Sequence, residues 1–220
     1  MIRFAGLGGA VGGLLFTTAT IVVASLRPEY SHTASFISEL GADGTAHAVL
    51  MNVTGFFPAG LLLGAVGIAI ARTLPTSRAA AFGTALIVLF GVGITVSGLI
   101  SCDAGCPQVA GSLENIVHNL IGPFAFFCAT FGMGVLAAAF RRIPGWRSLS
   151  GYSLASSVIA LVFLILLISS VESRVRTGLY QRLFLATVFI WYAIAGMRAY
   201  RLQKEQRVHV ITANSGAYIP

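Results

Sequence analysis

Six long apolar runs, separated by short polar segments, set the pattern of the chain. They cover approximately residues 4–26, 48–71, 79–100, 116–140, 149–171 and 183–200. Each run approaches or exceeds the roughly 20 residues that a helix needs to cross the hydrocarbon core of a bilayer. No segment of about ten residues shows the sustained alternation of apolar and polar positions that is typical of a membrane-spanning strand. The pattern therefore predicts an all-α polytopic membrane protein, built as a bundle of six transmembrane helices.

The composition agrees with this prediction. Of the 220 residues, 56% are hydrophobic and only 10% are charged, whereas a soluble domain has roughly 25% charged residues. The mean hydropathy is +0.87. The net charge of +7 resides in the short polar segments and not in a basic patch interleaved with aromatic residues. We therefore expect membrane lipids as partners, and no nucleic acid.

The distribution of Lys and Arg predicts the orientation in the membrane. With a cytoplasmic N-terminus, ten of the 14 basic residues lie inside, and four lie in the outer connections: Arg27, Arg174, Arg176 and Arg182. The first run is too long for the apolar region of a cleaved signal peptide, so we expect it to be retained. We expect both termini in the cytoplasm and a location in the cell (inner or plasma) membrane. The six-span domain then covers residues 1–200, and a polar cytosolic tail covers residues 201–220.

Several sequence elements occur in order at the predicted outer ends of the runs. They are "PEYS" at 28–31, "ISELGADGTAHAVLMNVTGF" at 37–56, "SCDAGCP" at 101–107, a histidine at 118 and "GLYQR" at 178–182. In this order they resemble a prokaryotic membrane family called domain of unknown function 998 (DUF998). The resemblance covers nearly the whole chain and implies a multi-spanning membrane protein of about this length. It implies no reaction, substrate or catalytic residue.

Cys102 and Cys106 flank a tight Asp-Ala-Gly turn in the second outer connection. Oxidising compartments favour disulfides, and Gly105 tolerates unusual backbone dihedrals, so we predict a disulfide between the two. It would fix the direction of Asp103. Metal ligation by the two thiolates stays open, although a structural zinc site needs four ligands. A redox-active pair also stays open, although the CxxC context of such pairs is missing.

His32, His47 and His118 all map to the predicted outer rim. A catalytic zinc site takes three protein ligands and a water, and these histidines could supply the ligands for zinc or another divalent metal. With Asp103 they are also the candidate catalytic residues. His118 is the strongest single candidate, because an ionisable group just inside a membrane span is costly and often functional. No close-spaced motif such as HExxH is present, so ordinary hydrogen bonds and ion pairs are the alternative that we favour.

The third outer connection carries Arg174 and Arg182 with Tyr180 close by. The planar fork of arginine suits phosphate and carboxylate groups. Together with Glu39 of the first connection, these residues are the candidate ligand-binding set. Pairing of the arginines with nearby acids is the alternative.

These features define three hypotheses for function. The first is an integral membrane protein of undetermined biochemical role that binds a lipid headgroup or a small polar ligand at its outer rim, where His118, His47, Asp103 and Arg182 converge. The second is a metal- or acid/base-dependent lipid hydrolase or transferase that uses the outer His/Asp cluster. The third is a scaffold or transporter subunit. Motifs for nucleotide binding, a nucleophile elbow or haem attachment are missing from the sequence.

Overall fold

The computed structural model describes the backbone of residues 2–215 and the side chains of residues 4–208. The side chains of Arg3 and of residues 209–220, which the sequence predicts to lie on the cytoplasmic side, lie outside the described part. Within it every regular element is a helix. In chain order these are η1 (Ile2–Leu7), α1 (Gly8–Ser25), η2 (Ile37–Gly41), α2 (Ala48–Met51), the π-turn η3 (Asn52–Phe56), α3 (Phe57–Ala71), α4 (Arg78–Ser97), α5 (Leu113–Phe140), η4 (Arg147–Leu149), α6 (Ser150–Ser170) and α7 (Thr177–Ser215).

Six helical segments are long and apolar enough to cross a membrane. They are Phe4–Ser25, Ala48–Ala71, Arg78–Ser97, Leu113–Phe140, Arg147–Ser170 and Thr177–Val208. Each overlaps one of the six predicted runs, so the prediction of an all-α, six-span fold is confirmed. Large apolar side chains such as Leu14 (69% exposed) and Leu120 (69% exposed) point out of the bundle, as expected for a surface that faces hydrocarbon.

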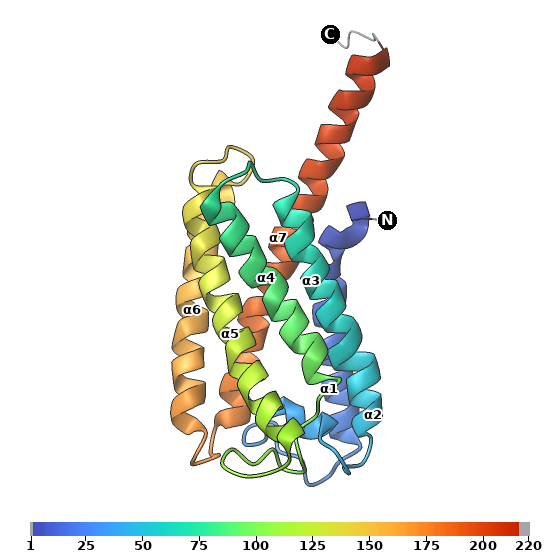
Figure 1. Cartoon of the computed structure of the whole chain (residues 1–220), viewed down its shortest axis with the longest axis vertical. Coiled ribbons are helices and arrows are strands. Elements are labelled where there is room, and N and C mark those ends of the chain that lie inside the picture. The colour runs from blue at the N-terminus through green and yellow to red at the C-terminus, as the bar shows by residue number, and fades with distance from the viewer. Residues whose placement is uncertain (1, 216–220) are drawn as a thin grey trace.

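The last helix differs from the predicted run in extent. It begins at Thr177 and not near residue 183, and it continues to Ser215, so the expected polar tail is helical as far as that residue. Its C-terminal part projects beyond the other helices (Figure 1). The early start escaped the hydrophobicity pattern because the first turns carry the polar residues Gln181 and Arg182, which hydrogen-bond to the backbone of the first connection at Ile37 and Ser35.

The spans form a closed ring in the order α1, α3, α4, α5, α6 and α7, with α7 packed back against α1. Both ends of the described chain lie at one end of the bundle (Figure 1). The other end carries the remaining three connections, residues 26–47, 98–112 and 171–176, which we call the cap. The neighbours α3 and α4 approach closely through glycines: a Cβ on Gly91 would overlap the backbone of Gly64 and lie 2.7 Å from the carbonyl oxygen of Gly60. Small residues permit such contact in lipid.

Hydroxyl groups join α5 to α6 in the half of the bundle away from the cap. Ser150 Oγ donates to the carbonyl of Ala137 and Ser157 Oγ donates to that of Thr130, each at 2.8 Å. Toward the cap, the described side chains make no hydrogen bond between these two helices. The pair is therefore held together at one end and free of polar links at the other, which matters for the pocket below.

Candidate functional site

Arg174 is the residue on which the cap is assembled. Its Nη1 donates to Glu39 Oε1 of the first connection at 2.7 Å. Its Nη2 donates to the carbonyls of Cys106 (3.0 Å) and Gly105 (3.2 Å) in the second connection. The guanidinium also lies 4.4 Å from the centre of the Phe36 ring. One side chain of the third connection therefore holds the other two together.

The disulfide lies inside this assembly. Cys102 and Cys106 are bonded, as predicted, and Ser38 Oγ lies 3.4 Å from Cys106 Sγ. The carbonyl of Cys102 accepts a hydrogen bond from the backbone N–H of Asp43 at 2.8 Å. The small ring is thus docked against the first connection on two sides.

Asp103 serves the second connection and the start of α5. Its carboxylate accepts hydrogen bonds from the backbone N–H and the Oγ of Ser112, both at 2.7 Å. These bonds, that from the hydroxyl first, hold the pKa of the Asp103 carboxyl below its ordinary value. Ser112 in turn caps α5 by accepting from the N–H of Asn115 at 3.1 Å. Both carboxylate oxygens of Asp103 therefore stabilise the second connection.

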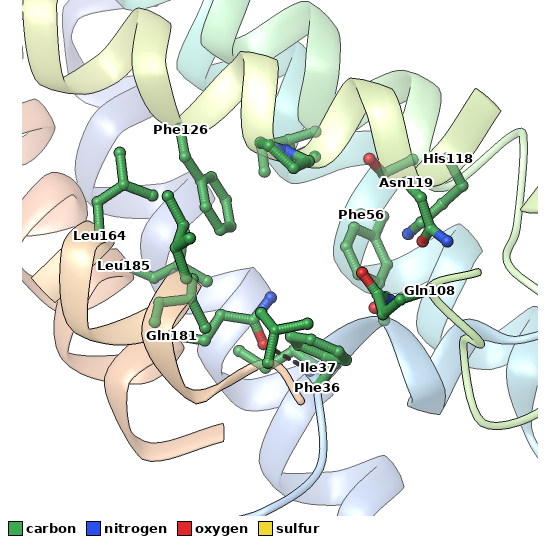
Figure 2. Close-up of a pocket in the computed structure, with 18 of the residues that line it drawn as sticks. Phe36, Ile37, Phe56, Gln108, His118, Asn119, Phe126, Leu164, Gln181 and Leu185 are labelled. Carbon is green, nitrogen blue, oxygen red and sulfur yellow. Dashed lines mark hydrogen bonds between the residues drawn. The ribbon is translucent and has the colours of Figure 1, made fainter. Parts of the chain in front are cut away.

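Beneath the cap, on the axis of the ring, lies a cavity of about 110 Å³, which we call the axial pocket. All six spans contribute to its wall, and the cap supplies its roof at residues 36–38. Its polar lining residues are Ser38, Ser97, Gln108, His118, Asn119 and Gln181; its apolar ones include Phe16, Phe36, Phe56, Phe126, Leu164 and Leu185. Figure 2 shows Gln108, His118 and Asn119 on one side and Phe126, Leu164 and Leu185 on the other. The pocket is therefore amphipathic.

His118 is buried at the polar side, with 7% of its surface exposed. Its Nδ1 lies 2.7 Å from the carbonyl oxygen of Ile100. Because a carbonyl oxygen can only accept, Nδ1 carries the proton and the neutral ring presents Nε2 as an acceptor. Nε2 has no hydrogen-bond partner in the described part of the chain.

The two amides beside His118 are fixed in the same way. Asn119 Nδ2 donates to the carbonyl of Pro107 at 2.8 Å, and Gln108 Nε2 donates to that of Cys106 at 2.9 Å. Both side-chain oxygens stay without a donor among the described residues. Pro123 has no N–H, so the main-chain carbonyl of Asn119 also lacks its usual helical donor. The polar side of the pocket is thus rich in unused acceptors.

The pocket reaches the surface between α5 and α6. Pro123 and Ile168, which line it from these two helices, are exposed, Ile168 at 52%. A Cβ added at Gly122 would meet no atom within 4 Å. The opening therefore lies where α5 and α6 have no polar links, on the surface that faces hydrocarbon.

Of the four candidate catalytic residues, only His118 lines the axial pocket. His47 is exposed, with a left-handed backbone (φ 62°) just before α2. His32 is exposed above the groove between α1 and α7, where partial burial, and secondarily the Arg182 charge, lower its pKa. Within the described residues no three His, Cys, Asp or Glu side chains form a group that could hold a metal ion. The expected convergence at the rim is not found: His32 and His47 lie at different places along the first connection, Asp103 lies in the second connection, and His118 lies in α5.

The candidate ligand-binding residues mostly stabilise the cap. Glu39 and Arg174 pair with each other. Arg182 donates to the carbonyls of Gly178 (2.9 Å) and Ser35 (3.3 Å) and to the hydroxyl of Tyr30. Tyr180 is partly buried and packs against the hydrophobic core.

Sequence reasoning missed Gln108, Asn119 and Gln181. The roof of the axial pocket depends on Gln181, whose Oε1 accepts from the N–H of Ile37 at 2.8 Å. One signal was present: Asn119 follows His118 inside an apolar run, and polar residues inside a span often have a function.

Comparison with known families identifies a match for this chain. The model of a family described as "Protein of unknown function (DUF998)" matches residues 10–198 of the chain. The resemblance noted in the sequence is therefore confirmed. No curated protein and no solved structure matches the chain.

Proposed function

The chain belongs to the DUF998 family of membrane proteins, and we propose that it binds a membrane amphiphile with an uncharged, hydroxyl-bearing head in the axial pocket. The observation that carries the proposal is the pairing of a polar side rich in free acceptors with an apolar side that opens between two spans. No Asp, Glu, Lys or Arg lines the pocket, and an unpaired charge is costly to bury.

The free acceptors specify the chemistry of the head. His118 Nε2 and the amide oxygens of Asn119 and of the exposed Gln108 accept no hydrogen bond within the described part of the chain, so each is available to a donor on a ligand. A hydroxyl group supplies one, whereas an ester or ketone oxygen does not. A head that bears one or two hydroxyls therefore fits better than one that bears only carbonyls.

The size and the opening specify the rest of the ligand. An engineered cavity of about 150 Å³ holds benzene, so the axial pocket, at about 110 Å³, holds a small head and not a whole lipid. The acyl chain of the ligand would leave the pocket between α5 and α6, beside Gly122, and remain in the hydrocarbon of the bilayer.

We also propose that the protein lies in the plasma membrane with the cap outside and both termini in the cytoplasm. The disulfide in the cap supports this orientation, because disulfides persist in oxidising compartments. The basic residues of the short opposite connections support it as well.

Binding of monoolein, a glycerol monoester with two free hydroxyls and one chain, tests the proposal. Native mass spectrometry of the detergent-solubilised protein is expected to detect one bound monoolein per chain, and no comparable binding of oleate, whose head is charged. Gly122→Leu places a side chain in the opening between α5 and α6, where the acyl chain would pass. It is therefore expected to weaken monoolein binding about tenfold or more.

Gly151→Leu is the matched control. Gly151 is also a helical glycine with no atom within 4 Å of an added Cβ, but it does not line the axial pocket. It is expected to bind monoolein like the wild type. Equal binding by Gly122→Leu and the wild type, or equal binding of oleate and monoolein, would refute the proposal.

A further inference from the structure

A second cavity runs between α1 and α7, on the outside of the ring. It measures about 280 Å³ and reaches the cap at His32 and Arg182; we call it the α1–α7 groove. Thr17, Ile21 and Ala186 line it and are exposed. The groove is therefore open along the surface that faces hydrocarbon, with a cation at one end.

Arg182 has no anionic partner among the described residues. Arg27 pairs with Glu29 at 2.9 Å and Arg174 pairs with Glu39 at 2.7 Å. Arg182 donates only to neutral oxygens, and no carboxylate lies within ion-pair distance of it in the described part of the chain. Charged groups near the membrane core are usually paired, so the charge of Arg182 lacks a counterpart.

The guanidinium of Arg182 also has donors to spare. Of its five N–H groups, two at Nη1 bind the carbonyls of Ser35 and Gly178, and one at Nη2 binds the Tyr30 hydroxyl. The N–H at Nε and the second N–H at Nη2 have no acceptor among the described residues. A phosphate oxygen is the acceptor that an arginine fork fits best in charge and geometry.

We propose that the α1–α7 groove binds an anionic phospholipid, with its phosphate on Arg182 and one acyl chain along the groove. His32, at the same end, adds a donor. Charge complementarity selects this occupant: a neutral lipid leaves Arg182 unpaired, and a zwitterionic one brings a cation with its phosphate.

This site is separate from the axial pocket in position and in chemistry. Phe16, Ile37 and Leu185 line both spaces and form the wall between them. Thr17 and Ala186 belong to the groove alone, whereas Gly122 belongs to the pocket alone. Each site can therefore be blocked without touching the wall that they share.

Dioctanoyl phosphatidylglycerol and dioctanoyl phosphatidylcholine, with identical chains, test the proposal by native mass spectrometry. The wild type is expected to bind the phosphatidylglycerol at least about tenfold more tightly than the phosphatidylcholine. Ala186→Phe fills the groove and is expected to reduce that binding by about tenfold or more. Ala138→Phe, on an exposed position of α5 outside all described cavities, is expected to leave it unchanged.

Arg182→Gln, which keeps hydrogen-bond donors but removes the charge, is expected to abolish the difference between the two lipids. If this variant does not fold, two measurements still test the inference: the comparison of the two lipids on the wild type, and their binding to Ala186→Phe. Equal affinity for both lipids, or unchanged binding in Ala186→Phe, would overturn the inference. Because Ala186→Phe leaves Gly122 and the axial pocket untouched, its monoolein binding is expected to persist, which separates the two proposals.

Discussion

Nη1 of Arg174 lies 2.7 Å from Oε1 of Glu39, although 135 residues separate the two along the chain. Oε1 of the same carboxylate accepts from the backbone N–H of Phe36 at 2.9 Å, at the start of the roof of the axial pocket. The ion pair therefore fixes the roof to the connection between α6 and α7. Both side chains are largely shielded from solvent, with 15% of Glu39 and 32% of Arg174 exposed.

Removal of the Arg174 side chain is expected to destabilise the protein by about 2–3 kcal/mol, because a partly buried carboxylate and two carbonyls lose their donor. Thermal or denaturant unfolding of Arg174→Ala in detergent measures the effect. Arg176→Ala is the control: Arg176 is exposed two residues away, and its loss is expected to change stability by less than about 0.5 kcal/mol. Similar losses in both variants would show that the guanidinium contacts do not hold the cap.

Gln181 is expected to contribute to both the stability of the protein and the binding of monoolein. Gln181→Leu leaves the buried N–H of Ile37 without an acceptor, which costs about 1–3 kcal/mol. It is also expected to weaken monoolein binding, because the roof loses a fixed point. Unfolding and binding of this variant are to be compared with Gln206→Leu, the same change at an exposed position of α7. A Gln181→Leu protein as stable as the wild type would contradict the prediction.

Acid is expected to destabilise the second connection through Asp103. The pKa of this carboxyl is lowered in the folded state by the hydrogen bonds from Ser112. Its contribution to stability is therefore complete above the unfolded pKa of about 3.9 and is lost as pH falls through the lower folded value. Unfolding curves of the wild type and Asp103→Asn between about pH 5 and pH 2 are expected to converge on acidification. A constant difference would exclude titration of Asp103 as the cause.

Thiol labelling in intact cells tests the orientation. A membrane-impermeant maleimide is expected to label the protein only after a reductant opens the Cys102–Cys106 bond, since Cys128 is buried in α5. The variant with both cap cysteines changed to serine serves as the control and is expected to stay unlabelled. Labelling that requires lysis as well as reduction would place the cap in the cytoplasm.

The variants used for binding are expected to fold normally. Gly122→Leu and Gly151→Leu each remove a glycine from a helix and place the new side chain in open space. Each is therefore expected to keep or gain stability, by about 0.5–1 kcal/mol per helical glycine replaced. Unfolding midpoints of both variants check this, and a large drop in either midpoint would contradict the prediction.

The fold was predictable from the sequence to the extent that hydrophobicity alone determines it. Lipid excludes every unpaired backbone group, so a long apolar run has helix as its only stable form. The start of α7 was not predictable in this way, because Gln181 and Arg182 are polar; both lie in the helix, and their side chains hydrogen-bond to the cap.

The candidate site was less accessible to prediction. The disulfide followed from two nearby cysteines and an outer location. The grouping of His32, His47 and His118 did not follow, because the path of the first connection decides where each ring lies, and that path depends on distant partners such as Arg174. Gln108 and Asn119 are uncharged and belong to no periodic pattern in the sequence. That both line the axial pocket becomes visible only in the folded bundle.

The wall formed by Phe16, Ile37 and Leu185 has a thermodynamic consequence. A molecule on one side that shifts any of these side chains also reshapes the space on the other side. Whatever factor an anionic phospholipid applies to the affinity for monoolein, monoolein must apply the same factor in return. Titration of each ligand in the presence of the other therefore measures the coupling free energy between the two sites.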